Sequence, residues 1–370
     1  MDIEKRYNHF YAPTFSVRVG KAQKDLLQES IEIFSVSVNS TLKGADDFSV
    51  TINNAMLPGA NDFLNFKNNL FSIDKDNDIT IKMGYGDRTA LPTILSGIIT
   101  GIEVSFPSNG ISQLTIKGYD HSHKMMKGQH SDSWGSDNNP VKYSDVVKKI
   151  ADKAQYKFGK SNIVDTREQH PQVKQDRQTD FDFIQNRLAS EIRFEVFVRG
   201  NDLYFRPRAN NSADVAAELI WGRTLVSFSP KLNTAEQISE VQVRGWDPST
   251  QKAIVGKARH GAEHGRDPGR EGGGDAVTAT QGNVVRHLWR PVSTEKEAED
   301  IAKSVLEKSA LDFVTGSAES LGIPDIMPGK NIKLSGLGKT FSKTYYIEKA
   351  THNISASGYK TTFDVKENTI

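Results

Sequence analysis

The amino-acid sequence predicts a mainly β protein in which two similar β-barrel domains flank an α+β insert. Apolar and polar residues alternate from Pro13 to about Asp120, which is the period of half-buried strands. The middle of the chain changes to the period of amphipathic helices. A second run of alternating strands then closes the chain. We therefore expect a first β-barrel domain at residues 1–120, an insert at 121–218 and a second β-barrel domain at 219–370.

The composition is that of a folded protein without a charge bias. The chain has 370 residues, enough for more than one hydrophobic core, and 36% of them are hydrophobic. Its formal net charge of +1 supplies no overall attraction for nucleic acid or an anionic membrane, so we expect no specific nucleic-acid binding. The absence of cysteine excludes disulfides, thiolate metal sites and a cysteine nucleophile.

The N-terminal segment Met1–Phe10 carries charges where a signal peptide needs an apolar run. No later segment approaches the ~20 apolar residues of a membrane-spanning helix. We therefore expect a chain without a membrane span that folds in the cytoplasm. It would leave the cell by lysis or as part of a particle.

Local patterns predict the elements of the first two domains. Strands are indicated by the alternation in Phe15–Val19, Ile31–Val38 and Phe48–Ile52. In the insert, Ser144 is the expected cap of a helix at about 144–155, because apolar residues follow it at helical spacing.

A second helix of the insert is predicted at about 179–191, where Thr179 and Asp182 fit a capping box. The alternating residues on both sides of Gly200-Asn201 predict a hairpin at about 193–206. The insert is thus a helix-and-hairpin domain.

The last domain is interrupted by a segment that does not look like a packed element. Residues 257–275 include six glycines and a proline, their opposite charges balance, and they have little to bury. We expect a mobile loop there that is dispensable for folding. After it, Thr294 and Glu297 form a capping box that opens a helix at about 294–311.

The strand order near the end of the chain repeats an order near the start. Ile79–Asp87 is similar to Asn331–Lys339, and both contain two glycines that favour a tight turn. Each segment is followed by a long alternating strand, a glycine turn and a last strand. This parallel predicts that the two β-barrel domains arose by internal duplication.

Several of these segments resemble one known family. The segments are Ala12–Gly20, Gln178–Pro207, Glu240–Asp247 and Leu321–Lys330. They are similar to the phage late control D family, the VgrG-like baseplate hub proteins of contractile tails and injection systems. The sequence leaves open whether the particle is a phage, a bacteriocin or an injection system. The resemblance implies two tube-type β-barrels and a structural role without catalysis or cofactor.

The resemblance also implies partners. Hub proteins of this family form a homotrimer that joins the hexameric inner tube to the trimeric spike and contacts other baseplate proteins. Two similar barrels in each of three chains would present six similar units to a six-fold ring, which makes the hub a symmetry adaptor. Some relatives continue into a spike, whereas this sequence stops at Ile370, so we expect a separate spike protein.

The residues that we select are interface and turn candidates. Pro324, Pro328 and Gly329 shape the corner that enters the second barrel, and Gly336 and Gly338 permit its tight turn. These residues could serve docking on a partner or only the stability of their loops, and the sequence leaves both roles open. The sequence has no phosphate loop, nucleophile elbow or zinc-protease helix, so no catalytic residue is selected.

Three acidic or histidine-rich patterns are weak metal candidates. The first lacks the glycine and glutamate of a calcium loop, the second has zinc-like spacing but glycines that oppose a helix, and the third lies on a polar connector. We expect no metal at any of them. The patterns are Asp74/Asp76/Asp78, His260/Glu263/His264 and Asp120/His121/His123/His130/Asp132.

Two other functions compete with the hub. One is a tail-associated peptidoglycan hydrolase. The other is a carbohydrate- or receptor-binding tail module, in which tryptophan side chains would stack on sugars. The tryptophans lie far apart in the sequence, which favours core packing for them. They are Trp134, Trp221, Trp246 and Trp289.

Overall fold

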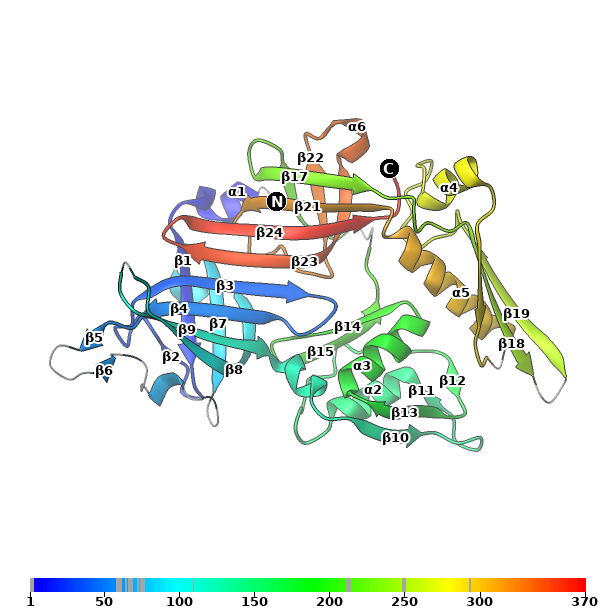
Figure 1. Ribbon diagram of the computed structural model, residues 1–370, viewed down its shortest axis with the longest axis horizontal. Helices are drawn as coiled ribbons and strands as arrows, with labels where there is room; N and C mark the ends of the chain where they lie inside the picture. The colour runs from blue at the N-terminus through cyan, green and yellow to red at the C-terminus, as the bar shows by residue number, and fades with distance from the viewer. Residues whose placement is uncertain are drawn as a thin grey trace.

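One large curled sheet organises the chain in the computed structural model (Figure 1). The structure describes residues 3–57, 62–63, 65, 69–71, 73, 77–108, 110–210, 214–247, 251–292 and 294–370. The strands of the sheet in the first half are β1 Pro13–Val19, β2 Lys24–Asp25, β3 Ile33–Thr41, β4 Asp47–Asn53, β7 Asp78–Tyr85, β8 Thr93–Ser105 and β9 Gln113–Asp120. Those in the second half are β16 Val215–Ile220, β17 Leu225–Leu232, β21 Val314–Leu321, β22 Asn331–Ser335, β23 Lys343–Ser355 and β24 Gly358–Glu367.

Smaller sheets and helices decorate this sheet. The remaining strands are β5 Met56–Leu57, β6 Asp62–Phe63, β10 His130–Trp134, β11 Val141–Lys142, β12 Gln169–His170, β13 Val173–Gln178, β14 Phe194–Arg199, β15 Asp202–Pro207, β18 Glu240–Asp247, β19 Lys252–Arg259 and β20 Val285–Trp289. The α-helices are α1 Ile3–Arg6, α2 Tyr143–Ala151, α3 Asp180–Phe183, α4 Gly273–Gln281, α5 Glu295–Ala310 and α6 Gly338–Phe341. A π-helical turn, Ile184–Ala189, continues α3. None of the described helices is long and apolar enough to cross a membrane.

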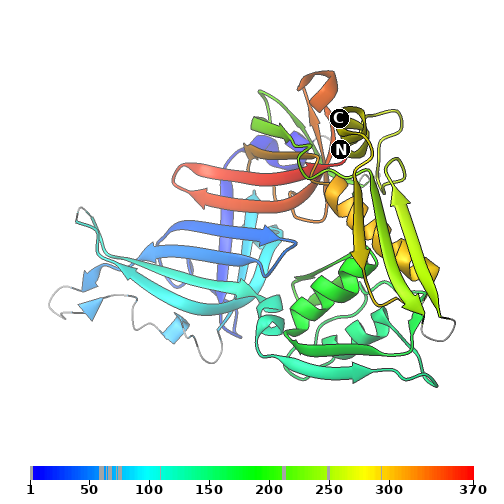
Figure 2. The same ribbon diagram turned by 45° about the vertical axis from the view of Figure 1, so that its right-hand side comes forward.

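The two halves of the sheet, for which the sequence predicts two β-barrel domains, are joined at β23. The first residues of β23 pair with β22, and residues from Lys349 onward pair with β3, which lies beside β23 in Figures 1 and 2. Ile354 and Tyr359 of the second half also belong to the core of the first half. Within the described residues, each half is an open, curled part of one sheet. The physical reason is the length of β23, which extends past its own half and bonds to the next.

The two halves have the same order of paired strands. The order is β3-β4-β9-β8-β7-β1 in the first half and β17-β21-β24-β23-β22-β16 in the second. Register shifts occur at corresponding places, at Phe34 and Val226 and at Thr100 and Glu348. One pairing differs, because β1 is antiparallel to β7 whereas β16 is parallel to β22.

Period-2 patterning builds the core. In β4, Phe48, Val50 and Ile52 are buried while the residues between them are partly exposed. One face of each strand therefore lies inside the curl, as the alternation in the sequence predicts.

The insert has its own hydrophobic cluster, formed by α2, α3 and the hairpin β14–β15. The Thr179 hydroxyl accepts a hydrogen bond from the Asp182 N–H at 3.0 Å and caps α3, as predicted. Ser144 is not a cap, because α2 already begins at Tyr143. The Ser144 hydroxyl instead donates to Asp165 at 3.1 Å.

A second insert, between β17 and β21, packs α5 on one face of the sheet β19-β18-β20 (Figure 2). Thr294 caps α5 by accepting from the Glu297 N–H at 3.1 Å, as predicted. Ala298 and Ala302 of α5 are buried against this sheet.

Segment 257–275 is not a loop throughout. Strand β19 extends to Arg259 and α4 begins at Gly273. The Arg266 guanidinium contacts Glu263 at 3.3 Å and also pairs with Asp275, and the His260 imidazole lies 2.8 Å from Asp275. The prediction of a loop over the whole segment is wrong at its two ends, which are a strand and a helix, and the charges of Glu263, Arg266 and Asp275 pair with one another between them.

Candidate functional site and interaction surfaces

The Pro-Gly corner between β21 and β22 attaches the insert to the large sheet. The Pro328 carbonyl accepts a hydrogen bond from Arg199, and the Gly329 carbonyl accepts one from Arg206 at 2.6 Å. Both arginines come from the hairpin β14–β15. The Gly329 N–H donates to the Ile347 carbonyl at 2.9 Å, with Gly329 at φ +79°. Since that φ favours glycine, the residue type is set by the turn.

The five residues selected from the sequence do not form one site. Pro324, Pro328 and Gly329 are buried, so their contacts are within the chain. Gly336, just before α6, and Gly338, its first residue, are exposed, with φ +82° and +74°. Of the five, only these two glycines lie where a partner protein could reach them.

A buried charged cluster, which was not selected from the sequence, lies next to the corner. Glu195 accepts hydrogen bonds from Arg206 at 2.9–3.0 Å and from the Tyr346 hydroxyl of β23. Burial raises the pKa of Glu195, and these two partners oppose the rise. The guanidiniums of Arg199 and Arg206 lie 4.8 and 5.3 Å from the Phe197 ring. The hairpin predicted around Gly200 places Glu195 opposite Arg206 in the register. The pairing of Glu195 with Arg206 could therefore have been predicted from the sequence.

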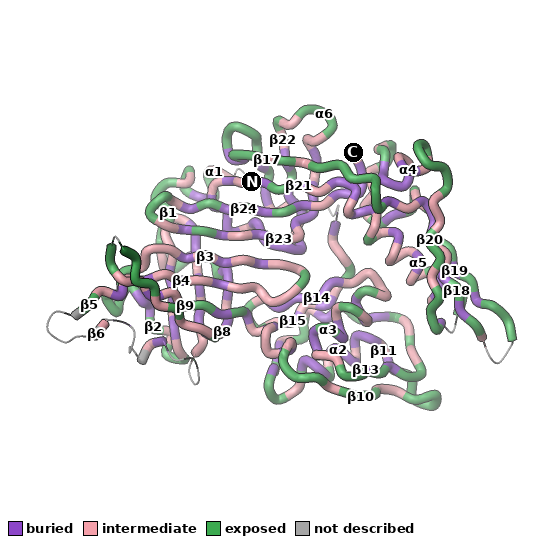
Figure 3. Tube along the Cα trace, in the orientation of Figure 1, coloured by how far each residue is buried: buried purple, intermediate pink, exposed green. Residues whose placement is uncertain are grey.

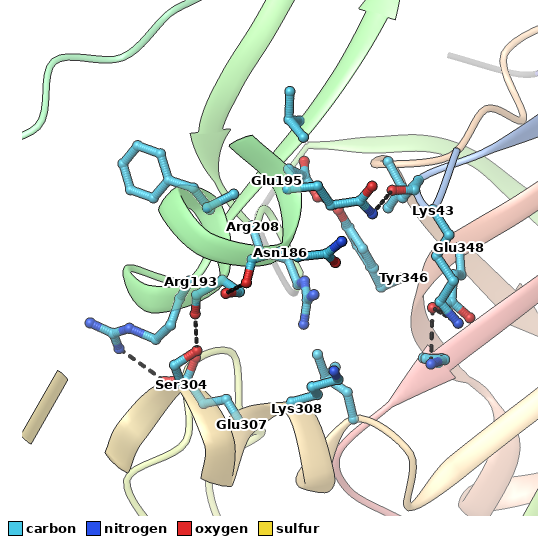
Figure 4. Close-up of a pocket in the computed structure, with 18 of the residues that line it drawn as sticks. Lys43, Asn186, Arg193, Glu195, Arg208, Ser304, Glu307, Lys308, Tyr346 and Glu348 are labelled. Carbon is cyan, nitrogen blue, oxygen red and sulfur yellow. Dashed lines mark hydrogen bonds and ion pairs between the residues drawn. The ribbon is translucent and has the colours of Figure 1, made fainter. Parts of the chain in front are cut away.

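A cavity of about 440 Å³ opens between the insert, α5 and β23 (Figure 4). Acidic and basic side chains pair along its wall: Arg193 contacts Glu307 at 3.0 Å, and Lys43 contacts Glu348 at 3.1 Å. The Ser304 hydroxyl of α5 donates to a carbonyl of the insert. These contacts tie three parts of the chain together, which makes the cavity a structural junction.

Two neighbouring carboxylates, the half-buried Asp46 and the buried Asp120, lie where the large sheet meets the insert. Burial raises the pKa of Asp46 to about 6, against the opposing charge of Arg199. Burial and the neighbouring Asp46 raise the pKa of Asp120 well above its ordinary value. Asp120 accepts hydrogen bonds from the Ser122 hydroxyl at 2.5 Å and from its N–H at 3.1 Å.

Several of the metal candidates make contacts within the protein, whereas the buried Nδ1 of His121 has no hydrogen-bond partner among the described residues. His260 and Glu263 bond within segment 257–275, the His123 ring stacks on Tyr119, and His130 lies 3.9 Å from Asp180. No group of three or more potential ligands gathers in the part of the chain that the structure describes. Of the first pattern, Asp74 and Asp76 lie outside the described residues.

The prediction of core packing holds for one tryptophan of the four. Trp134 stacks on Phe183 at 5.5 Å, whereas Trp221, Trp246 and Trp289 are 59%, 58% and 73% exposed. Trp246 and Trp289 lie on the open face of the sheet β19-β18-β20, with Arg244 opposite Trp289 in the register. The helix α5 covers the other face of this sheet, where small side chains such as Ala298 and Ala302 form the contact. The two tryptophans are therefore not part of that packed face.

Two strand segments of the large sheet have an open side among the described residues. Strand β8 pairs with β7 only as far as Ile98, so Gly101–Ser105 has no strand on that side among the described residues. Strand β17 pairs with β21 on one side, and within the described chain no strand pairs with Ser227–Leu232 on the other. Most of β17 is exposed in Figure 3. Phe106, just after β8, and Leu232 of β17 are 66% and 49% exposed.

Comparisons with known proteins identify a family and a fold. A family model described as the Alg8 N-terminal domain matches residues 14–356. No curated protein matches the chain.

The similar solved structures are tail proteins and a secretion component. A 43 kDa tail protein of prophage MuSo2 from Shewanella oneidensis has a TM-score of 0.68 at 9% identity, covering 96% of this chain and 98% of that one. A tail protein from Neisseria meningitidis has a TM-score of 0.64 at 16% identity, covering 96% and 97%. A type VI secretion system component from Escherichia coli has a TM-score of 0.53 at 13% identity, covering 90% and 73%. The chain therefore has the fold of these proteins.

Proposed function

The chain belongs to the Alg8 N-terminal domain family, and we propose that it is the structural baseplate hub of a contractile tail or injection system. The proposal agrees with the fold that it shares with phage tail proteins and with the sequence resemblance to late control D and VgrG-like hubs. The observation that carries it is the equal strand order of the two halves of the sheet. The hub is neither an enzyme nor a cofactor protein, and it works by binding its neighbours.

The equal strand order favours an internal duplication. Six strands of each half pair in the same order, and the first half adds β2 beside β1. Two register shifts of each half fall at corresponding positions, whereas a third lies in β7–β8 in the first half and in β16–β22 in the second. A register shift bends a strand locally, so the two shared shifts give the corresponding strands of the two halves a similar bend. Each chain then carries two similar units.

Two units in a chain give the hub a way to match symmetries. A homotrimer would present six similar units to a hexameric inner tube on one face. Its other face keeps true three-fold symmetry, which suits a separate trimeric spike. The chain is thereby incorporated into a virion tail or an injection particle together with other baseplate proteins.

The stoichiometry of the purified full-length chain tests this proposal. Native mass spectrometry should give three copies, and the trimer should bind assembled rings of the tube protein encoded with it. A chain that remains a monomer at micromolar concentration and in the presence of tube rings contradicts the proposal. A peptidoglycan-release assay on the same preparation tests the hydrolase alternative, for which catalytic turnover would be required.

A second candidate function is favoured by one surface. The exposed Trp246 and Trp289 on the open face of the sheet β19-β18-β20 fit a carbohydrate- or receptor-binding module. Binding to a glycan array that is lost in Trp246→Ala and Trp289→Ala would support it. Retention of tube binding by both variants would show that this surface is separate from the hub contacts.

A further inference from the structure

We propose that the outer edge of β8 pairs with β17 of a second copy of this chain. The inference rests on the proposed hub, in which several copies form a ring. It assigns the strands, the register and the side chains of the contact between copies. The junction that already joins the two halves within one chain supplies the geometry.

That internal junction is antiparallel and seven residue pairs long. It runs from Lys349 opposite Thr41 to Ser355 opposite Ser35. In the equal strand order of the two halves, β23 corresponds to β8 and β3 corresponds to β17. As β23 pairs with β3 within one chain, β8 is thus expected to pair with the counterpart of β3, which is β17. Within one chain β8 and β17 are not paired, so only a second chain can complete this junction.

The register shifts fix which residues would face each other. The shift at Thr100 corresponds to the shift at Glu348, so Gly101 takes the place of Lys349. The shift at Val226 corresponds to that at Phe34, so Ser227 takes the place of Ser35. Transferring the internal register gives these facing pairs: Ile102 with Leu232, Glu103 with Lys231, Val104 with Pro230, Ser105 with Ser229, and Phe106 with Phe228.

The apolar pairs explain why both edges expose hydrophobic side chains. In the internal junction the corresponding inward-facing residues, such as His352 and Val38, are fully buried. At the two edges, Phe106 is largely exposed although its ring lies 5.2 Å from that of Phe63, Leu232 is half exposed and Val104 is partly exposed. Three apolar pairs would be removed from water on the same face of the sheet, which favours association.

The polar pair supplies charge complementarity. Glu103 and Lys231 are both exposed, and the contact that Glu103 now makes is an exposed ion pair with Lys117 at 2.7 Å. Their internal counterparts are Thr351 and Asn39, whose side chains are hydrogen-bonded at 2.8 Å. Side chains at this position therefore touch across the junction. An acidic residue facing a basic one there favours the pairing and its register.

Pro230 shapes the junction in one further way. It takes the place of Val38 and has no N–H, so the ladder between copies has fewer backbone donors than the internal one. A proline at an outer edge also limits pairing with unrelated strands. Because one backbone hydrogen bond is missing, the pairing of β8 with β17 would depend more on side-chain contacts than a full strand ladder does.

Paired cysteines test the register, because the chain has no cysteine of its own. The in-register variant is Glu103→Cys with Lys231→Cys, and the control is Glu103→Cys with Ser227→Cys, four residues out of register. All three positions are exposed, so both variants should unfold at the temperature of the original chain. Under mild oxidation the in-register variant should give covalent trimers in a denaturing gel, and the control should give several-fold less.

Native mass spectrometry of the same samples separates the two claims. A trimer without in-register crosslinks, or with equal crosslinking in the control, overturns the edge pairing and leaves the hub standing. Monomers in every sample, at micromolar concentration and also after assembled tube rings are added, overturn both. Charge reversal gives a second readout: Glu103→Lys should weaken association several-fold, and Lys231→Glu in the same chain should restore it.

Discussion

Acid should weaken the joint between the two halves through His352, a residue of β23. The imidazole is fully buried, with Nε2 2.9 Å from the Ile326 carbonyl and Nδ1 2.9 Å from the Tyr359 hydroxyl. The carbonyl can only accept, so Nε2 carries the proton and Nδ1 accepts from the hydroxyl. Burial lowers the pKa of His352 from 6.5 to about 4. The folded chain therefore holds the neutral ring.

The direction and size of the effect follow from this pKa. Below 6.5 the unfolded chain binds a proton at His352, whereas the folded chain binds it only near pH 4. The stability contributed by the neutral ring is thus full above 6.5 and is lost as the pH falls from 6.5 to about 4. The pKa difference corresponds to about 3 kcal/mol of unfolding free energy.

Denaturant unfolding of the original chain and of His352→Gln, measured at steps between about pH 7.5 and pH 4, isolates this residue. Gln does not titrate, and the other titrating groups are common to both chains, so they cancel in the difference. The stability advantage of the original chain should shrink by about 3 kcal/mol on acidification. His287→Gln, at an exposed position, is the control. An advantage that stays constant with pH would refute the buried neutral ring.

Three further substitutions test packing and charge, each by thermal or denaturant unfolding. Gly256→Ala would place a methyl group 2.2 Å from the α5 backbone at Ala298 and should cost about 1–3 kcal/mol; an unchanged stability would contradict the close contact. Arg266→Ala removes a partner of the buried Glu263 and should cost about 1–3 kcal/mol, whereas no loss would restore the view of 257–275 as dispensable. Asp120→Asn should stabilise the chain by about 1–3 kcal/mol at pH 7.5 and progressively less toward low pH, because the raised pKa makes the ionised form costly; destabilisation at pH 7.5 would contradict this.

The parts of the fold that were predictable are those with local causes. Thr179 and Thr294 cap their helices because a hydroxyl followed three residues later by an acidic residue satisfies free N–H groups within one turn. The hairpin around Gly200 follows from alternation on both sides of a turn. Ser144 was misplaced because α2 begins one residue earlier, after Lys142, which makes no side-chain cap hydrogen bond, so this helix start lacks the capping signal that a sequence can show.

The joint at β23 had no local cause in the sequence. Alternating residues show that a strand has one buried face, but they do not show which strand bonds to its edge. Ala350 and Ile354 have the same pattern whether β23 pairs with β3 or ends a closed barrel. The contact of Glu195 with Tyr346 could not be predicted for a similar reason, since the two residues lie 151 positions apart along the chain. The division of the chain after residues 120 and 218 stays a prediction.

A reconstruction of the assembled particle by electron cryomicroscopy tests the central claim most directly. We predict three copies of this chain between the tube and the spike, with their six half-sheets facing the six subunits of the last tube ring. The edges of β8 and β17 should meet between neighbouring copies, with Glu103 facing Lys231. A map that places the chain in the sheath, a tail fibre or the capsid, or that shows a copy number other than three, would contradict the account.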